Sequence, residues 1–173
     1  MKILDVGCGD NKNPSAIGID RLLKPGVDIV HNLDEFPWPL KDNSFDLIIC
    51  KHIIEHLDDV VKTMEEIHRV GRPGAKVVVE TPHFSSFNSF RDPTHKWHFS
   101  YDTFDYFSGN SLYPVYTKCR FFIRAKKYVF INRWDVGNII SKIAPKFYES
   151  HFVWLFPPYS MYFELEVVKK LEK

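Results

Sequence analysis

The sequence predicts one α/β domain, built on a mainly parallel sheet with an antiparallel strand pair at its C-terminal end. Short, nearly continuous apolar segments that stop at an acid, a glycine or a cysteine are typical of buried parallel strands. A helical pattern lies between two of these segments, in the strand–helix–strand order of a right-handed parallel crossover. The 173 residues, 45% of them hydrophobic, are enough for a single domain with its own core.

Seven strands are expected along the chain, five short ones in the first half and two longer ones in the second. Their ranges are 2–6, 16–20, 26–30, 45–50, 75–81, 119–132 and 161–169. The short strands contain few polar positions, so we expect both faces of the sheet to be covered. The two long strands are expected to form the antiparallel pair that closes one edge of the sheet.

The main helix is predicted between the fourth and fifth strands. It begins near Asp58 and Asp59 and is stopped by the glycines and proline of 71–74. Its apolar face carries Ile53, Leu57, Val61, Met64 and Ile67. Only nine residues, 7–15, separate the first two strands, and Pro14 lies among them. Because a parallel crossover usually needs about a dozen residues, we expect the first helix to be shortened to a turn or two, or absent.

The second half of the chain has its own composition. It holds 24 of the 27 Phe, Trp and Tyr residues, and its 13 Lys and Arg exceed its 8 Asp and Glu, whereas residues 1–80 carry 10 basic and 14 acidic side chains. We expect a loop-rich segment over 82–118 with a helix near 101–107, and an aromatic-rich helical excursion over 135–154. The late aromatic residues fit three roles that the sequence leaves open: core packing, contact between two copies, or contact with a membrane surface.

Charge and composition exclude several classes of protein. A net charge of +1 gives no basic footprint for nucleic acid. No apolar run reaches the ~18 residues that would span a bilayer, and the start of the chain lacks the pattern of a secretion signal. The three cysteines, Cys8, Cys50 and Cys119, are scattered without a CxxC pair, which indicates reduced thiols and a cytoplasmic location.

The sharpest chemical signal is the segment Leu4-Asp5-Val6-Gly7-Cys8-Gly9-Asp10. An acid near the end of the first strand is followed by two glycines, which let the backbone turn and let a ligand lie against the main chain. Asp20 ends the second strand, where ribose hydroxyls are commonly bound. A nicotinamide dehydrogenase is disfavoured, because Lys12 stands where a third glycine is expected and Asp20 lies only 11 residues after Gly9.

This segment and those that follow it resemble the class I S-adenosylmethionine-dependent methyltransferases. The LDVGCG strand and loop, the IGID strand end, the DNSFDLIICKHIIEHL stretch and the RPGAKVVVETP turn and strand occur in that family's order, over about residues 2–82. The later segments PHFSS, DPTHKWHFS and FELEVVKK look like a small bacterial subgroup. The resemblance implies a Rossmann-like fold with a seven-stranded, mainly parallel sheet, S-adenosyl-L-methionine as the cofactor, and methyl transfer as the reaction.

The resemblance also implies a set of cofactor-binding residues. Those nearest the methionine part would be Asp5 and the backbone of 7–9, and Asp20 would bind the ribose hydroxyls. The adenine would meet 32–33, although many members of the family carry Asp at the first of these positions. The full set is Asp5, Gly7, Cys8, Gly9, Asp20, Arg21, Asn32, Leu33 and Lys51, the last of these near the methyl donor.

The single domain, 1–173, is expected to divide its work between two halves. Residues 1–82 would bind the cofactor, and residues 83–173 would supply the substrate pocket with its lid and close the sheet. Within 83–113, the side chains expected to contact the acceptor are Arg91, Trp97 and His98. The candidates for a catalytic base, which an oxygen or nitrogen acceptor can require, are His52 as first choice and then His83 and His95.

Two histidine patterns resemble parts of a metal site, and neither is complete. His52 and His56 would share one helix face with Glu55 between them, but the sequence shows no clear third ligand. The second pattern comprises His83, His95, His98 and Asp92. Its spacings match no strong motif, so we expect pocket and packing roles for these histidines and no metal.

The expected function is transfer of a methyl group from S-adenosylmethionine to an oxygen or nitrogen of a small-molecule or glycan-precursor acceptor. One alternative is an RNA or protein methyltransferase. Another is a non-catalytic module that binds the cofactor and pairs with another protein. We expect no membrane span and no nucleic-acid partner, and a homodimer through the aromatic C-terminal region stays open.

Overall fold

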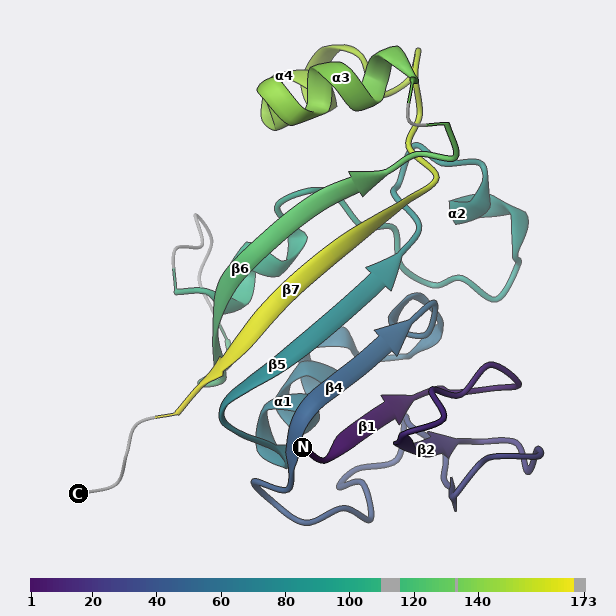
Figure 1. Cartoon of the computed structure of the whole chain (residues 1–173), viewed down its shortest axis with the longest axis vertical. Coiled ribbons are helices and arrows are strands. Elements are labelled where there is room, and N and C mark those ends of the chain that lie inside the picture. Colours follow the sequence, from purple (N-terminus) through teal and green to yellow (C-terminus); the bar gives the residue numbers. More distant parts are fainter. Residues whose placement is uncertain (110–115, 133, 170–173) are drawn as a thin grey trace.

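The computed structural model describes residues 1–109, 116–132 and 134–169. Within them, seven strands form one sheet in the order β3-β2-β1-β4-β5-β7-β6 (Figure 1). The strands are β1 (Ile3–Val6), β2 (Ala16–Asp20), β3 (Ile29–Val30), β4 (Phe45–Lys51), β5 (Gly71–Thr81), β6 (Arg120–Val129) and β7 (Ser160–Val168). Neighbours from β3 to β5 are parallel, whereas β7 runs antiparallel to both β5 and β6. The predicted fold class is therefore confirmed.

The helical segments are short and few. They are η1 (Ile54–His56), α1 (Val60–Val70), α2 (Asn88–Arg91), η2 (Thr103–Phe107), α3 (Val136–Ile143) and α4 (Pro145–His151). Residues 7–15, all of them described, contain no helix, as their number predicts. Hydrogen bonds hold this connection instead. The Asn13 N–H donates to the Asp5 carboxylate at 2.7 Å, and the Gly7 N–H donates to the Ile19 carbonyl at 2.8 Å.

One face of the sheet is covered by α1. Asp59 precedes this helix, as expected, and its carboxylate accepts a hydrogen bond from the Lys62 N–H at 2.9 Å. The bond satisfies one of the amides that a helix start leaves free. Met64 and Ile67 are fully buried in the main core, together with the alternate side chains of β5 and β7 that face the helix. Of the five predicted face residues, Val61, Met64 and Ile67 lie on α1, whereas Ile53 and Leu57 flank η1 and lie before the helix.

The opposite face of the sheet is largely polar, so the expectation that both faces are covered was wrong. Lys76 on β5 pairs with Glu164 on β7 at 2.6 Å, and Arg124 on β6 pairs with Glu166 on β7, also at 2.6 Å. A small apolar cluster near β1 completes this face; it consists of Ile3, Ala16 and Ile49. The physical reason is the length of the connections, because those from β1 to β2 and from β2 to β3 are too short for helices that would cover this face.

The segment after β5 is loop-rich, as expected, and the predicted helix near 101–107 is the short turn η2. An isolated bridge between His83 and Phe99 closes the segment on itself. The helical excursion between β6 and β7 forms α3 and α4, which lie beyond the end of the sheet (Figure 1). Glu149 on α4 joins the two, because its carboxylate lies 2.9 Å from the His83 ring and accepts a hydrogen bond from the Tyr101 N–H at 2.7 Å. The functional division at residue 82 stays a prediction.

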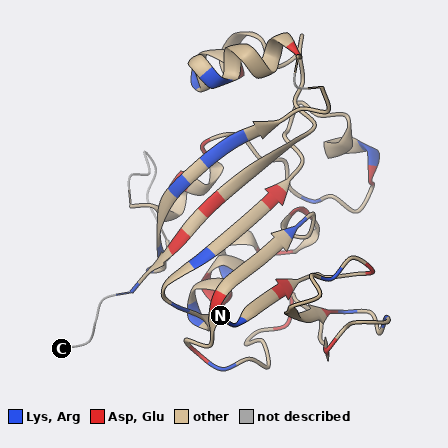
Figure 2. Ribbon diagram, in the orientation of Figure 1, with Lys and Arg blue, Asp and Glu red and all other residues tan. Residues whose placement is uncertain are grey.

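The carboxyl edge of the parallel strands carries charges of both signs (Figure 2). Asp5 and Glu80 are the last residues but one of β1 and β5, and Lys51 is the last residue of β4. Ligands of open α/β sheets bind at this edge, so it is where a site is sought. In the part of the chain that the structure describes, no helix has both the length and the apolar content that a membrane span needs.

Candidate active site

Two cavities lie at the carboxyl edge of the sheet. The strand-end cavity, of about 530 Å³, is lined by Gly7, Asp20, Arg21, Asn32, Leu33, Asp34, His52, Ile53, His56, Leu57, Pro93, Thr94 and Lys96. The histidine cavity, of about 500 Å³, is lined by His52, His56, Pro82, Asn88, Arg91, Asp92, Pro93, His95 and Tyr159. His52, His56 and Pro93 belong to both linings, so one wall separates the two spaces.

Gly7 shapes the floor of the strand-end cavity. Its φ of +65° is in the left-handed region, and a Cβ at this position would lie 2.4 Å from the Ile53 side chain. Such a distance is far below van der Waals contact, so only glycine lets β1 turn here against Ile53. The close approach brings the end of β1 against the start of the segment that follows β4.

Asp20 places a carboxylate at the end of β2. Its Oδ2 accepts a hydrogen bond from the Gly9 N–H at 2.9 Å, and its Oδ1 accepts one from the Leu22 N–H at 2.9 Å. Each oxygen keeps a lone pair for another donor, because an ionised carboxylate accepts about four hydrogen bonds. Arg21, the next residue, also lines the cavity.

The connection after β3 supplies the far wall of the strand-end cavity. Leu33 is buried there, and the Asn32 amide donates to the Glu35 carboxylate at 3.2 Å while its carbonyl accepts from the Asp34 N–H at 3.3 Å. Asp34 itself lines the cavity and accepts a hydrogen bond from the Asp58 N–H at 2.7 Å. A carboxylate is thus present on this wall, two residues after the position where the sequence shows Asn.

Four of the predicted cofactor residues lie outside this lining, namely Asp5, Cys8, Gly9 and Lys51. Burial raises the pKa of the Asp5 carboxyl, although the hydrogen bond from Asn13 opposes this effect. Burial also raises the pKa of the Cys8 thiol, which packs near Gly18 and is a poor nucleophile in this state. Asp5 and Cys8 therefore shape the loop, whereas Gly9 contributes its N–H to Asp20.

His52 stands in the wall between the two cavities. Its φ of 51° is unusual for a residue with a side chain, and its N–H donates to the Glu80 carbonyl at 2.8 Å. The ring is half-exposed, with Nδ1 3.4 Å from Glu55 Oε1 and Nε2 3.9 Å from Glu80 Oε1. Glu55 raises the pKa of His52, so the ring holds a proton more readily than a free imidazole.

His95 and His56 face each other across the histidine cavity, with ring centroids 4.6 Å apart. His83, by contrast, is fully buried, and it lines neither cavity. It is held between the Ser85 hydroxyl at 2.8 Å and the Glu149 carboxylate at 2.9 Å. The structure brings His52 and His95 to one cavity and places His83 in a packing role, so we do not propose His83 as a base.

Of the three predicted acceptor residues, one lines a cavity and two do not. Arg91 lines the histidine cavity. Trp97 donates its indole N–H to the Leu57 carbonyl at 2.8 Å, and His98 stacks on Phe90 with centroids 4.3 Å apart. These last two side chains lie outside both linings. Residues 110–113 of the predicted lid lie outside the described residues.

Several lining residues were not predicted from the sequence. They are Asp34, Ile53, Leu57, Pro82, Asn88, Pro93, Thr94 and Tyr159. Asp34 could have been suspected as an acid just after the third strand. No local pattern marks Tyr159, which lines the cavity from the position just before β7, nearly eighty residues after Pro82.

The sequence matches a known family model. The model described as "Methyltransferase domain" matches residues 20–79. Among curated proteins, a probable S-adenosylmethionine-dependent methyltransferase of Mycolicibacterium smegmatis is 35% identical over 115 residues, which cover 56% of this chain and 44% of that protein. An uncharacterised protein of Methanocaldococcus jannaschii is 31% identical over 84 residues, 43% of this chain and 37% of that protein. The chain thus spans less than half the length of these relatives.

Solved structures show the same fold at low identity. A SAM-dependent methyltransferase from Archaeoglobus fulgidus matches with a TM-score of 0.60 at 18% identity, over 95% of this chain and 85% of that one. A SAM-dependent methyltransferase from Mesorhizobium loti matches with a TM-score of 0.57 at 16% identity, over 95% and 90% of the two chains. At such identity the likeness concerns the arrangement of the sheet.

Proposed function

We propose, since this chain belongs to the class I S-adenosylmethionine-dependent methyltransferases, that it transfers a methyl group to an oxygen or nitrogen of a small-molecule acceptor. The strand-end cavity would bind the cofactor and the histidine cavity would bind the acceptor. A glycan precursor is the acceptor class we favour, because the polar histidine cavity holds hydrogen-bonding groups and a cation, Arg91.

The residues of the strand-end cavity fit S-adenosylmethionine. Asp20 keeps free lone pairs on both carboxylate oxygens, which suits the two hydroxyls of a ribose. Leu33 and Ile53 offer apolar surface for a purine. Outside that lining, in the loop after β1, a Cβ on Gly9 would meet nothing within 4 Å, so the main chain there is open. When bound, the cofactor supplies a methyl group on a positively charged sulfur.

The single observation that carries the proposal is the shared wall. His52 lines both cavities, so it would lie beside a ligand in either. A neutral His52 ring could take up the proton that an oxygen or nitrogen acceptor loses, and Glu55 would stabilise the resulting imidazolium. The other contributions of the chain are alignment of the two ligands and exclusion of water between them.

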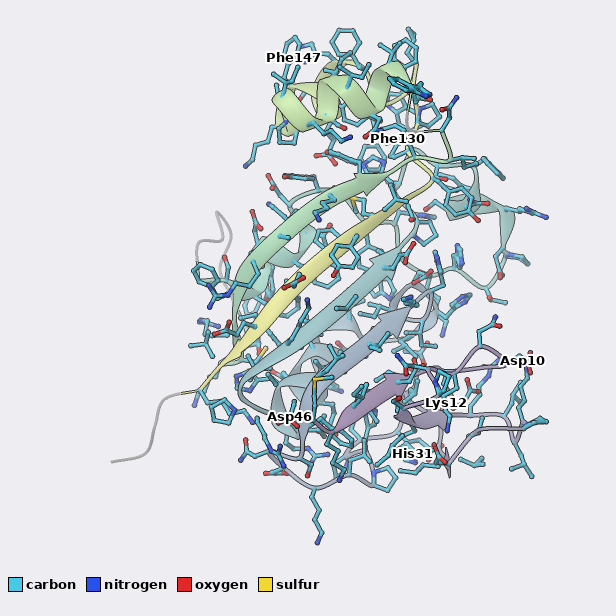
Figure 3. All side chains as sticks on the ribbon, viewed as in Figure 1. Asp10, Lys12, His31, Asp46, Phe130 and Phe147 are labelled. Atoms are coloured by element: carbon cyan, nitrogen blue, oxygen red, sulfur yellow. The ribbon has the colours of Figure 1, made fainter. Side chains whose placement is uncertain are left out.

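Calorimetry with S-adenosylmethionine tests the cofactor assignment. Asp20→Ala should weaken binding by ~1–3 kcal/mol, which is the usual loss for a charged hydrogen-bond acceptor. Asp10→Ala is the matched control, because Asp10 lies at the outer tip of the loop after β1 (Figure 3) and pairs only with Lys24 in the contacts seen there. Equal affinity of the two variants would remove Asp20 from the site, and no binding by the parent protein would overturn the proposal.

Transfer of a radiolabelled methyl group then identifies the acceptor class. The protein is incubated with labelled cofactor and, separately, with sugar derivatives, small amines, RNA and protein. Label in a small molecule supports the proposal, whereas label only in RNA or protein supports the alternative acceptors. Cofactor binding with no transfer to any class would favour the non-catalytic module.

We also propose that a second copy of the chain covers the apolar surface of the excursion. Ile143 is 81% exposed, Trp154 71% and Leu155 69%, and Phe147 lies on the side of the helix pair that faces away from the sheet (Figure 3). Several large apolar side chains exposed on one short excursion are a feature of interaction surfaces. Sedimentation should show a dimer that Ile143→Ser dissociates. A monomeric parent that binds lipid vesicles would instead support a membrane surface as the partner.

A further inference from the structure

Three side chains from two distant segments meet beside the histidine cavity. Glu55 and His56 come from η1, and His95 comes from the loop after α2. One ligand atom from each lies within 4.8 Å of the others. The sequence pairs His56 with His52 and lacks a third ligand, but the fold supplies His95 from 39 residues further along the chain.

Hydrogen bonds fix the tautomers of both histidines. The Thr94 hydroxyl donates to Asp92 Oδ1 at 2.7 Å, so it accepts from His56 Nδ1, which lies 2.8 Å away. The Ser89 carbonyl can only accept, so His95 Nδ1 donates to it at 3.2 Å. In the neutral rings each Nε2 therefore carries a lone pair. Metal-binding histidines are oriented in this way, by donating the other ring N–H to an oxygen.

Glu55 adds a buried carboxylate to the two rings. It is 1% exposed, and neither oxygen accepts a hydrogen bond from the described residues. A buried carboxylate without hydrogen bonds costs several kcal/mol unless a cation faces it. His52 lies 3.4 Å from one oxygen and offers charge only when it is protonated.

We propose that Glu55, His56 and His95 bind a divalent transition-metal ion. Two imidazole nitrogens and one carboxylate form the protein ligand set of open Zn²⁺ sites and of non-haem Fe²⁺ sites. Ligands bound at ~2.1 Å in tetrahedral geometry lie about 3.4 Å apart, so closure on an ion needs side-chain shifts of about an ångström. Zn²⁺ is the probe of choice because it has no redox chemistry.

The remaining coordination positions would face the histidine cavity, which both His56 and His95 line. There the ion would bind an acceptor oxygen and lower the pKa of its hydroxyl. This role rests on the proposed function, whereas binding of the ion depends only on the three ligands. The two can fail separately, and the experiment is designed to show which one does.

Competition with a chromogenic chelator measures ion binding to protein that has been stripped of metal. We expect the parent to bind one Zn²⁺ per chain, and His95→Ala to bind it at least 30-fold more weakly. Thr94→Val removes the hydroxyl that orients His56 and should weaken binding by about 10- to 100-fold. His151→Ala is the matched control, because His151 is exposed on α4, where it hydrogen-bonds to the Phe147 carbonyl and packs on the Phe147 ring, away from the three ligands.

Cofactor calorimetry and thermal melting on the same preparations separate the outcomes. His95 is only half-buried, so the variant should fold, and an unchanged melting temperature of the metal-free protein verifies this. Parent protein that binds neither Zn²⁺ nor Co²⁺, or variants that bind as the parent does, would overturn the metal site. If cofactor affinity persists in that case, the proposed methyl transfer stands without an ion.

Discussion

Replacement of Gly7 by alanine would test how the floor of the strand-end cavity is built. A Cβ there would lie 2.4 Å from Ile53 Cγ1, 2.5 Å from Cδ1 and 2.8 Å from Cβ. Rotation of the Ile53 side chain relieves the first two contacts but not the third, because Cβ is fixed to the backbone. The segment after β4 must therefore move away from β1.

Two costs add in Gly7→Ala. Left-handed backbone costs a residue with a Cβ about 1–2 kcal/mol, of which ~0.4–1 kcal/mol is recovered because the unfolded chain becomes less flexible. Overpacking of this kind costs about 1–3 kcal/mol more. Gly74→Ala is the control, because Gly74 has a φ of +79° and nothing within 4 Å of its Cβ position. It carries the backbone cost alone.

Urea denaturation of the three proteins gives the difference directly. Gly7→Ala should lose about 1–3 kcal/mol more free energy of unfolding than Gly74→Ala. It should also bind S-adenosylmethionine more weakly, because Ile53 lines the strand-end cavity. Equal losses in the two variants would show that the contact with Ile53 does not constrain the turn, and the account of Gly7 would be refuted.

Three further outcomes are expected. Because Glu55 raises the pKa of His52, an NMR titration of metal-free protein should show the His52 ring losing its proton above the ordinary pKa of about 6.5, and Glu55→Gln should lower the midpoint. The attraction between protonated His52 and Glu55 stabilises the fold fully below that ordinary pKa, and this stabilisation is lost as the pH rises through the raised pKa of His52. Arg69→Ala should destabilise the protein by about 2–3 kcal/mol in denaturant, because the buried Glu66 carboxylate loses its ion pair and keeps only the Trp38 N–H as a donor. Arg72→Ala, at an exposed ion pair, should cost less than about 1 kcal/mol. Arg91→Ala should raise the KM of an acidic acceptor with little change in melting temperature, and an unchanged KM would remove Arg91 from the acceptor pocket.

The strands were predictable because their signals are local. A run such as Phe45–Cys50 is apolar at nearly every position, and its burial depends little on what packs against it. The absence of a helix between the first two strands was equally predictable, since nine residues with a proline cannot form a crossover helix. The exposure of the second face of the sheet was not predictable, because Ile3 and Ile49 look like core residues in the sequence and form only a small satellite cluster in the fold.

The site was predictable where it follows strand ends and not where it depends on loops. Gly7 and Asp20 end consecutive strands, and the parallel sheet brings them to one edge. His83 and His95 lie in one loop-rich segment, but one packs against Glu149 while the other faces His56. Which partner each histidine meets depends on residues far away in the sequence, Glu149 for His83 and His56 for His95, and no local pattern records them.

Glu149 links α4 to the loop-rich segment that follows β5. Its side chain holds both His83 and the Tyr101 backbone, and the segment between these two residues carries Arg91 and His95. Anything that shifts α4 therefore acts on the histidine cavity from outside it. By thermodynamic linkage, a partner that binds the helix pair and changes acceptor affinity by some factor would itself be bound tighter or weaker by the same factor when acceptor is present.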